Sequence, residues 1–146
     1  MKLKIKKLKN NAVIPVRATE YSAGADLFAC IEQPLTIKKG ETVKIPTGIS
    51  AEPEDMNTVL LIYARSGLAV NYGISLANCV GVIDSDYRGE IIVPLTNTSD
   101  NDFTVEPDMR IAQLVVMPVC TAPAVEVTEF DETERGAGGF GSTGKQ

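Results

Sequence analysis

The chain has 146 residues and a mass of 15.6 kDa, a size that fits one domain with its own core. Its net charge of −5 argues against sequence-independent binding to DNA or RNA, which depends on Lys and Arg contacts to phosphates. The chain contains no histidine, which excludes Ser-His-Asp and Cys-His catalysis and every histidine metal site. A general base must therefore be Asp or Glu, or less readily Lys, Tyr or Cys.

The N-terminal segment alternates between apolar and basic residues. Leu3 and Ile5 share one face and Lys2, Lys4 and Lys6 the other, a period of two that predicts a half-buried strand. No apolar h-region follows these lysines, so we expect no signal peptide, and no apolar run approaches the length that spans a bilayer. We expect a cytoplasmic protein, or a nuclear one in a eukaryote.

Further strand signals recur along the chain and alternate with turn clusters such as "PEDMN" and "NTSDND". One short helix of about two turns is expected in "SGLAVNYG", with Ser66 as its N-cap. Many short strands between turns predict an all-β sandwich, jelly roll or barrel. The other predicted strands lie in "ETVKIPTGI", "TVLLIYA", "GEIIVPL" and "IAQLVVMPV".

The three cysteines, Cys30, Cys79 and Cys120, are far apart, and none belongs to a C-x-x-C pair. We expect buried, small apolar residues in a reducing compartment rather than metal ligands or disulfides.

The segment "RGAGGFGSTG", residues 135–144, is half glycine. It contains G-x-G-x-x-G, but only five residues follow Gly141, so no helix of a dinucleotide-binding unit can follow; no P-loop motif occurs either. Its glycine N–H groups, the Ser142 and Thr143 hydroxyls and Arg135 suit phosphate, and Phe140 offers a flat face to a base. The segment is either a frayed terminus or a lid that orders over a nucleotide.

Four stretches upstream carry further candidate residues. They are "AGADLFA" with Asp26, "ARSGLA" with Arg65, Ser66 and Gly67, "NCVGVIDSDYRGEI" with Asn78 and Asp84, and "RIAQLVV" with Arg110 and Gln113. The third is expected to be a hairpin, with an apolar strand, an acidic turn and a second strand.

In this order, the five stretches resemble the five motifs of the homotrimeric dUTP pyrophosphatases (dUTPases), and length and β-rich character agree over the whole chain. "GVIDSDYRGE" and "RGAGGFGSTG" carry the resemblance most specifically. One departure is Ala64, where the family often has proline before the arginine. That position shapes the turn and should leave the chemistry unaffected.

The resemblance implies a jelly-roll-like all-β subunit with at most one short helix, assembled as a trimer with active sites at subunit interfaces. It implies a β domain over residues 1–131 and a flexible Gly-rich tail over 132–146 that closes over a neighbouring subunit's site. The activity implied is Mg²⁺-dependent hydrolysis of dUTP to dUMP and pyrophosphate. Such an activity would keep uracil out of DNA and supply dUMP for thymidylate synthesis.

Asp84 is the candidate catalytic residue, because an ionised carboxylate can orient and activate the water that attacks the α-phosphorus. A turn aspartate that caps a backbone N–H is the plain alternative, and we assign Asp86, two residues on, to the turn. By resemblance, the Tyr87 ring excludes a 2′-hydroxyl, and Asn78 reads uracil. The backbone of Val82, Ile83 and Ile92 is expected to read uracil as well.

By resemblance, the phosphates contact Arg65, Ser66, Gly67 and Gln113, and Arg135 reaches the terminal phosphates. Taken singly, each of the first four is equally typical of a surface residue or a hydrogen-bonding residue at a strand end. Arg110 either joins them or pairs with an interface carboxylate. By resemblance, Asp26 contacts the magnesium ion through water, and a packing or turn role is the alternative. Phe140 is expected to stack over uracil, with Gly141, Ser142 and Thr143 beside the substrate.

Two other functions remain open from the sequence. The first is a dCTP deaminase or bifunctional relative on the same fold, which dCTP turnover would reveal. The second is a regulatory protein that uses the nucleotide as a switch for a protein partner. The presence of Asp84, Tyr87, Arg135 and Phe140 favours the enzyme over both.

Overall fold

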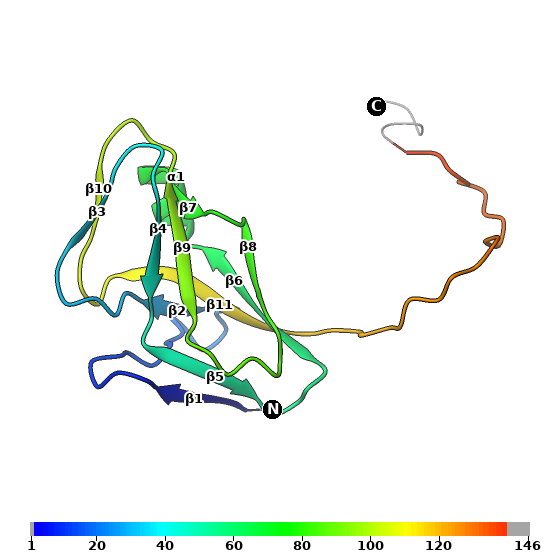
Figure 1. Ribbon diagram of the computed structural model, residues 1–146, viewed down its shortest axis with the longest axis horizontal. Coiled ribbons are helices and arrows are strands. Elements are labelled where there is room, and N and C mark those ends of the chain that lie inside the picture. Colours follow the sequence, from blue (N-terminus) through cyan, green and yellow to red (C-terminus); the bar gives the residue numbers. More distant parts are fainter. Residues whose placement is uncertain (1, 140–146) are drawn as a thin grey trace.

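The computed structural model describes residues 2–139, which form eleven strands and one short helix (Figure 1). The all-β class with one short helix is therefore confirmed, and no helix among these residues is long and apolar enough to cross a membrane. The elements are β1 (Leu3–Lys7), β2 (Ala25–Phe28), β3 (Leu35–Ile37), β4 (Thr42–Pro46), β5 (Ile49–Pro53), β6 (Thr58–Ala64), α1 (Ser66–Tyr72), β7 (Ile74–Leu76), β8 (Val80–Ile83), β9 (Ile92–Asn97), β10 (Phe103–Val105) and β11 (Arg110–Pro118).

The strands pair antiparallel in four small sheets, with orders β2-β11-β6-β8, β4-β9-β7, β1-β5 and β10-β3. Side chains from these sheets enclose one core. Along β6, Leu60 and Ile62 are buried while Val59 and Leu61 are half-buried, the alternation that a strand imposes on successive side chains. Full burial of such a side chain stabilises the fold by about 1.5–3 kcal/mol.

Helix α1 follows β6 directly. It begins at Ser66, so the prediction of Ser66 as N-cap is wrong by one position. Arg65 is the N-cap, in an extended conformation, and its carbonyl accepts the N–H groups of Leu68 at 3.1 Å and Ala69 at 3.0 Å. The strand thus runs into the helix without a loop, which places Arg65 at the junction.

The segment between β8 and β9 is not a paired hairpin, which corrects that prediction. Strand β8 pairs with β6, whereas β9 pairs with β4 and β7, so the turn at residues 84–91 crosses from one sheet to the other. The two strands prefer different partners because each meets a complementary apolar strand distant in the sequence.

The cysteines differ from one another in exposure. Cys30 is buried, as predicted, and burial raises the pKa of its thiol. Cys79 and Cys120 are exposed, because Cys79 lies in the tight turn before β8, with φ at +61°, and Cys120 lies just beyond β11. The prediction of three buried cysteines is therefore wrong for two of them.

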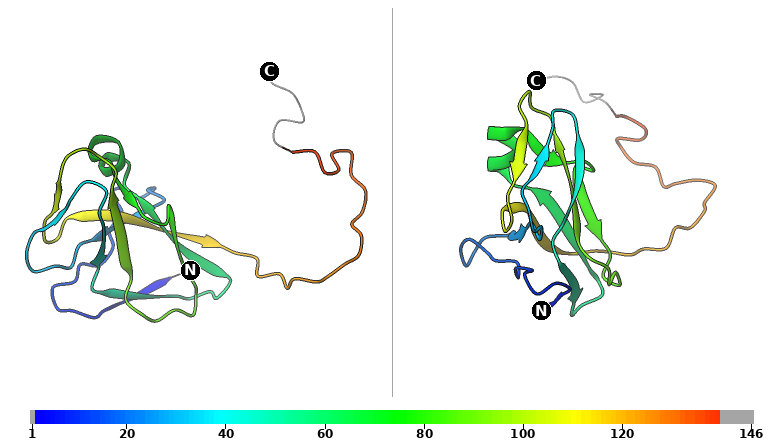
Figure 2. Two further views of the ribbon diagram at one scale, coloured as in Figure 1. Left: turned by 45° about the horizontal axis from the view of Figure 1, so that its top comes forward. Right: turned by 60° about the vertical axis from the view of Figure 1, so that its left-hand side comes forward.

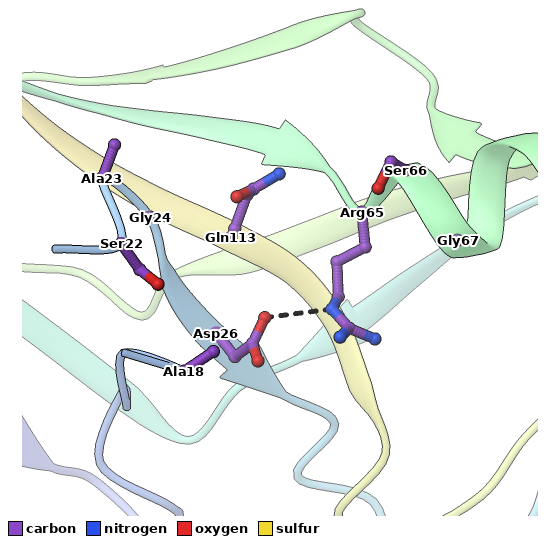
Figure 3. Close-up of a pocket in the computed structure, with 9 residues that line it drawn as sticks. All are labelled: Ala18, Ser22, Ala23, Gly24, Asp26, Arg65, Ser66, Gly67 and Gln113. Carbon is purple, nitrogen blue, oxygen red and sulfur yellow. Dashed lines mark hydrogen bonds and ion pairs between the residues drawn. The ribbon is translucent and has the colours of Figure 1, made fainter. Parts of the chain in front are cut away.

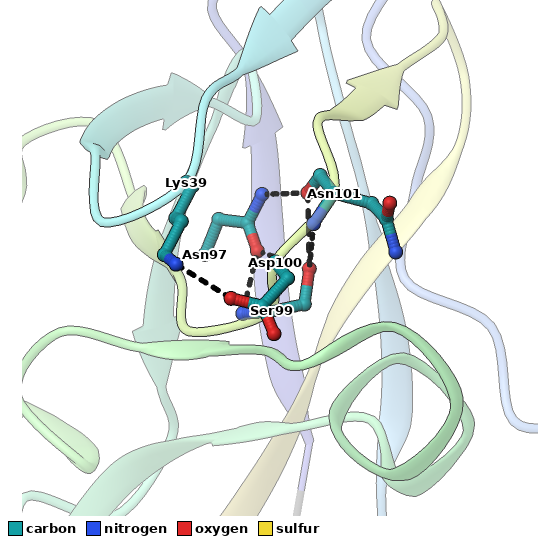
Figure 4. A network of polar contacts seen from close by, with 5 residues as sticks. All are labelled: Lys39, Asn97, Ser99, Asp100 and Asn101. Atoms are coloured by element: carbon teal, nitrogen blue, oxygen red, sulfur yellow. Dashed lines mark hydrogen bonds and ion pairs between the residues drawn. The ribbon is translucent and has the colours of Figure 1, made fainter.

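Asn97, at the end of β9, is fully buried and ties two loops to the core (Figure 4). Its Nδ2 donates to the carbonyl oxygens of Ile37 at 2.9 Å and Asn101 at 2.7 Å. Its Oδ1 accepts from the Ser99 amide at 3.0 Å and the Ser99 hydroxyl at 2.8 Å. Both the amide nitrogen and the amide oxygen of the Asn97 side chain therefore have two partners each.

The chain leaves the body of the molecule after β11. The Val119 amide still donates to the Asn57 carbonyl at 2.9 Å, and residues 120–139 form neither helix nor strand. Figures 1 and 2 show this segment as a long arm extending away from the sheets. Val125, Val127 and Phe130 on the arm are 77%, 53% and 91% exposed, so the arm buries little apolar surface on its own chain.

The Asn97 network generates a stability prediction. Asn97→Ala leaves the Ile37 and Asn101 carbonyl groups without their donor, and we expect a loss of about 2–4 kcal/mol in unfolding free energy. Asp100→Ala is the control, because its pair with Lys39 is solvent-exposed and worth at most about 1 kcal/mol. Urea denaturation at one fixed protein concentration measures both. Equal losses in the two variants would contradict this account of the network.

Candidate functional site

A cavity of about 360 Å³ gathers residues from three of the predicted stretches (Figure 3). We call it the arginine pocket. Asp26 comes from β2, Gln113 from β11, and Arg65, Ser66 and Gly67 from the junction of β6 with α1. The pocket is lined by Ala18, Ser22, Ala23, Gly24, Asp26, Arg65, Ser66, Gly67 and Gln113.

Sheet register brings these residues together. Strand β11 lies between β2 and β6, and Gln113 is level with Asp26 on one side and Tyr63 on the other. Arg65 follows Tyr63 by two residues, so its side chain starts from the same end of the sheet. Residues 26, 65 and 113 therefore meet although they are distant in the sequence.

Asp26 lies between two guanidinium groups. Its Oδ1 accepts a hydrogen bond from Arg65 Nε at 2.9 Å, and its Oδ2 accepts one from Arg110 Nη1 at 3.2 Å. The Asp26 side chain is only 15% exposed, which strengthens both attractions relative to a fully hydrated pair. Arg110 thus pairs with a carboxylate, as one alternative held, but the carboxylate belongs to its own chain.

The arginine pocket does not fit a dedicated magnesium site. Both Asp26 oxygens already accept from cations, and the two positive charges oppose a divalent ion bound directly there. Across residues 2–139, no three Asp, Glu or Cys side chains gather closely enough to hold a metal ion. The predicted contact between Asp26 and magnesium through water stays a prediction.

Two residues that the sequence reasoning missed shape this pocket. The Arg17 guanidinium donates to the carbonyl oxygens of Ser22 and of Ala23, the latter at 2.7 Å, and so fixes the loop that forms one wall. At Gly24, a Cβ atom would lie 2.4 Å from Gln113 Oε1. Glycine at position 24 therefore leaves room for Gln113, whose Nε2 donates to the Ala64 carbonyl at 2.9 Å.

A second cavity, of about 260 Å³, lies at the turn between β8 and β9. We call it the turn pocket. It brings together Asp84, Tyr87 and the strand ends that were predicted to bind the base. Its lining residues are Val82, Ile83, Asp84, Tyr87, Glu90, Ile91 and Ile92.

Asp84 is the first residue of a tight turn, and its carbonyl accepts the Tyr87 amide at 3.1 Å. Its carboxylate is exposed and forms no hydrogen bond or ion pair with any residue that the structure describes. Asp86 lies inside the turn, as expected from its spacing. The Asp84 oxygens therefore remain available to orient a water molecule, in contrast to those of Asp26.

The two pockets lie far apart on the same chain. In the antiparallel pair of β6 and β8, Ile83 is opposite Leu60, so Asp84 is level with Val59. Arg65, directly after the end of β6, is six residues beyond Val59, which corresponds to about 20 Å at the rise of a strand. Neighbouring phosphates of one nucleotide are only a few ångströms apart, so Arg65 and Asp84 of one chain do not meet at the same phosphate.

The other predicted residues lie outside both pockets. Asn78 is exposed in the turn before β8. Arg135 is exposed on the arm, where its Nε donates to the Gly138 carbonyl at 2.9 Å. Phe140, Gly141, Ser142 and Thr143 lie outside the described residues.

Comparison with known proteins identifies the class. The dUTPase family profile matches residues 10–144, and the chain belongs to this family. It is 51% identical over 146 residues to the deoxyuridine 5'-triphosphate nucleotidohydrolase of Glaesserella parasuis, spanning 100% of this chain and 97% of that protein. The corresponding protein of Paraburkholderia xenovorans is 47% identical over 143 residues, spanning 98% and 97%. The chain is therefore an enzyme, a dUTP diphosphatase.

Solved structures of dUTPases share the fold of this chain. The dUTPase of Staphylococcus bacteriophage 80alpha with dUpNHpp superposes with a TM-score of 0.87 at 28% identity, covering 99% of both chains. A mutant dUTPase of phage phi11 of S. aureus, described with a structural Mg(II) ion, has a TM-score of 0.80 at 22% identity. It covers 90% of this chain and all of that one.

The Asp26 ion pairs generate a prediction. Asp26→Asn removes the charge that holds Arg65 and Arg110, so we expect kcat/KM for dUTP to fall by about 10²-fold through misplaced arginines. Steady-state pyrophosphate release measures the loss, and Asp100→Asn is the matched control on an exposed pair. The loss should persist at raised Mg²⁺. Full rescue by Mg²⁺ would show instead that Asp26 acts on the metal.

Proposed function

We propose that the enzyme hydrolyses dUTP by direct attack of a water molecule on the α-phosphorus, with Asp84 as the general base. The water proton moves toward an Asp84 oxygen as the new P–O bond forms, and pyrophosphate leaves without a covalent enzyme intermediate. The observation that carries this assignment is the exposed Asp84 carboxylate at the turn pocket, which has no partner among residues 2–139. Base assistance of this kind contributes about 10²–10⁴-fold in rate.

We propose that the turn pocket selects the nucleoside. The Tyr87 ring is 46% exposed and lies at the pocket, where it can pack on deoxyribose and exclude a 2′-hydroxyl. Val82, Ile83 and Ile92 line the same pocket. Their backbone groups would pair with uracil, together with Asn78. A close-fitting backbone would leave no room for the 5-methyl group of thymine.

We propose that the arginine pocket holds the triphosphate. Arg65, Ser66, Gly67 and Gln113 supply donors around one cavity, and donors fixed before binding stabilise the charge that develops on a leaving pyrophosphate. Mg²⁺ would arrive on the phosphate oxygens of the substrate, since it prefers such ligands and keeps several waters. A mutant dUTPase of phage phi11 is described with a structural Mg(II) ion, which shows that this metal binds one protein of this fold.

We propose a homotrimer whose active sites lie between subunits. The support is the separation of about 20 Å between Arg65 and Asp84 along one chain, because a complete site then needs pockets from two copies. The exposed apolar residues of the arm, Val125, Val127 and Phe130, also favour contact with a second copy. Residues 132–146 would act as a tail that places Arg135 and Phe140–Thr143 over a neighbour's nucleotide.

We propose that the reaction serves nucleotide metabolism in the cytoplasm. Removal of dUTP would limit uracil incorporation into DNA, and the dUMP formed would feed dTMP synthesis. Membership of the dUTPase family and the nucleotide chemistry of the two pockets support this role.

Replacement of Asp84 tests the mechanism. Asp84→Asn keeps the size of the side chain and removes the base, so we expect kcat for dUTP to fall by at least about 10²-fold with KM little changed. Pyrophosphate release from dUTP, dTTP, dCTP and UTP, each with and without Mg²⁺, gives the measurement. Asp86→Asn, two residues on in the same turn, is the control and should retain activity.

Two outcomes would contradict this account. An Asp84→Asn enzyme with near-normal kcat would remove Asp84 from the chemistry. Turnover of dCTP by the wild-type enzyme would show that the turn pocket does not select uracil, and would favour the deaminase-related alternative.

A further inference from the structure

The turn that carries Asp84 and Tyr87 is closed by its own hydrogen bonds. The Tyr87 amide donates to the Asp84 carbonyl at 3.1 Å, and Arg88 Nη1 donates to the carbonyl oxygens of Ser85 at 2.8 Å and Tyr87 at 3.1 Å. These bonds shape the turn but do not attach it to the sheets. Its position must therefore come from contacts at its ends.

The Tyr87 ring is placed by the end of this turn. The Tyr87 hydroxyl donates to the Glu90 carbonyl at 3.2 Å, and the ring covers Gly89 so closely that a Cβ there would lie 2.4 Å from Tyr87 Cζ. The ring thus moves with the backbone of residues 89 and 90. Whatever fixes Glu90 also fixes the face that Tyr87 presents to the turn pocket.

The Glu90 side chain attaches the backbone of residues 89 and 90 to the connection between β4 and β5. Its Oε1 accepts the Gly48 amide at 2.7 Å in a partly buried setting. Gly48 has φ at +69°, and a Cβ there would lie 2.6 Å from Cys30 Sγ and 2.8 Å from Ala12 Cβ. The Glu90 carboxylate therefore binds a tightly packed part of the backbone, between β4 and β5. This part of the backbone has little freedom to move with the turn at residues 84–91.

The turn is also attached at Ile91, by backbone bonds and one buried hydroxyl, and at Arg88, by an exposed ion pair; the Thr47 amide donates to the Ile91 carbonyl at 3.3 Å. The Ile91 amide donates to the Ile49 carbonyl at 2.9 Å, and its carbonyl accepts the Thr47 hydroxyl at 2.6 Å. Arg88 reaches Glu52 at 3.7 Å through an exposed ion pair, which adds little. Among the described residues that line the turn pocket, Glu90 is the side chain that crosses to the β4–β5 connection.

We propose that Glu90 is a positioning residue for sugar selection: its bond to the Gly48 amide holds the Tyr87 ring where it blocks a 2′-hydroxyl. This inference rests on the proposed role of Tyr87 in excluding the ribonucleotide. Glu90 acts through Tyr87 and the turn, and takes no part in the proton transfer assigned to Asp84. Loss of the anchor would let the ring retreat and admit UTP.

The test compares dUTP with UTP in three variants of the full-length enzyme. Glu90→Ala removes the acceptor and should lower the ratio of kcat/KM for dUTP over UTP by at least about fivefold. Glu90→Gln keeps an acceptor for Gly48 and should retain most of the wild-type ratio. Glu41→Ala is the matched control, because the Glu41 carboxylate likewise accepts a backbone amide, that of Lys38 at 2.9 Å, in a distant turn.

The selectivity ratio separates positioning from general stability. Equal losses toward dUTP and UTP in Glu90→Ala, with the ratio unchanged, would overturn the proposal. The same ratio in Tyr87→Ala tests the proposed function on which it rests. If Tyr87→Ala leaves selectivity intact, the role of Tyr87 fails; if Tyr87→Ala loses selectivity and Glu90→Ala keeps it, the role of Glu90 alone fails.

A measurement on the wild-type enzyme applies even if Glu90→Ala does not fold. The Gly48 amide should exchange slowly with solvent in the wild-type enzyme, because the Glu90 carboxylate accepts it, and Glu90→Gln should keep most of that protection. Hydrogen exchange followed by NMR reports both. A Gly48 amide that exchanges as fast as a solvent-exposed amide in the wild-type enzyme would contradict the bond on which the proposal depends.

Discussion

The antiparallel pairing of β6 with β8 places Arg65 and Asp84 at opposite ends of the same two strands. A strand pair is rigid along its length, so this separation of about 20 Å cannot be closed by movement of side chains. The proposed phosphate-binding residues and the proposed nucleoside-binding residues of one chain therefore lie in two separate pockets. This separation is the basis of our proposal that the arginine pocket of one copy meets the turn pocket of another.

The two candidate aspartates differ because their surroundings differ. Asp26 is nearly buried and accepts from two guanidinium groups, so its charge is used within the fold to orient Arg65 and Arg110. Asp84 is exposed at the start of a turn, and its carboxylate has no partner among the described residues. The same functional group is thus held by ion pairs within the fold at one site, and at the other it is exposed, as the proposed role of a base for water requires.

Strong local patterns made much of this predictable from the sequence. The apolar runs of β4, β6, β9 and β11 were predicted because each is long enough to show its period. The strands β3, β7 and β10 have three residues each, too few to carry a period, and were not predicted. The candidate residues of both pockets were found by motif, but their division between two pockets depends on strand register.

The errors and omissions share a cause. The predicted hairpin failed because β8 and β9 pair with strands distant in the sequence, and the exposure of Cys79 and Cys120 likewise depends on where the turn and the arm lie. Glu90 was overlooked because its partner, Gly48, is 42 residues away. Contacts between residues distant in the sequence cannot be predicted from local composition, because only folding brings the two residues together.

Subunit complementation tests the central claim most directly. Arg65→Ala and Asp84→Asn should each be nearly inactive alone. If every site combines the arginine pocket of one copy with the turn pocket of another, random co-assembly of equal amounts should restore about a quarter of the wild-type activity, since half of each pocket type is intact. A mixture that stays at the summed activity of the two separate variants would show that each chain carries a self-contained site.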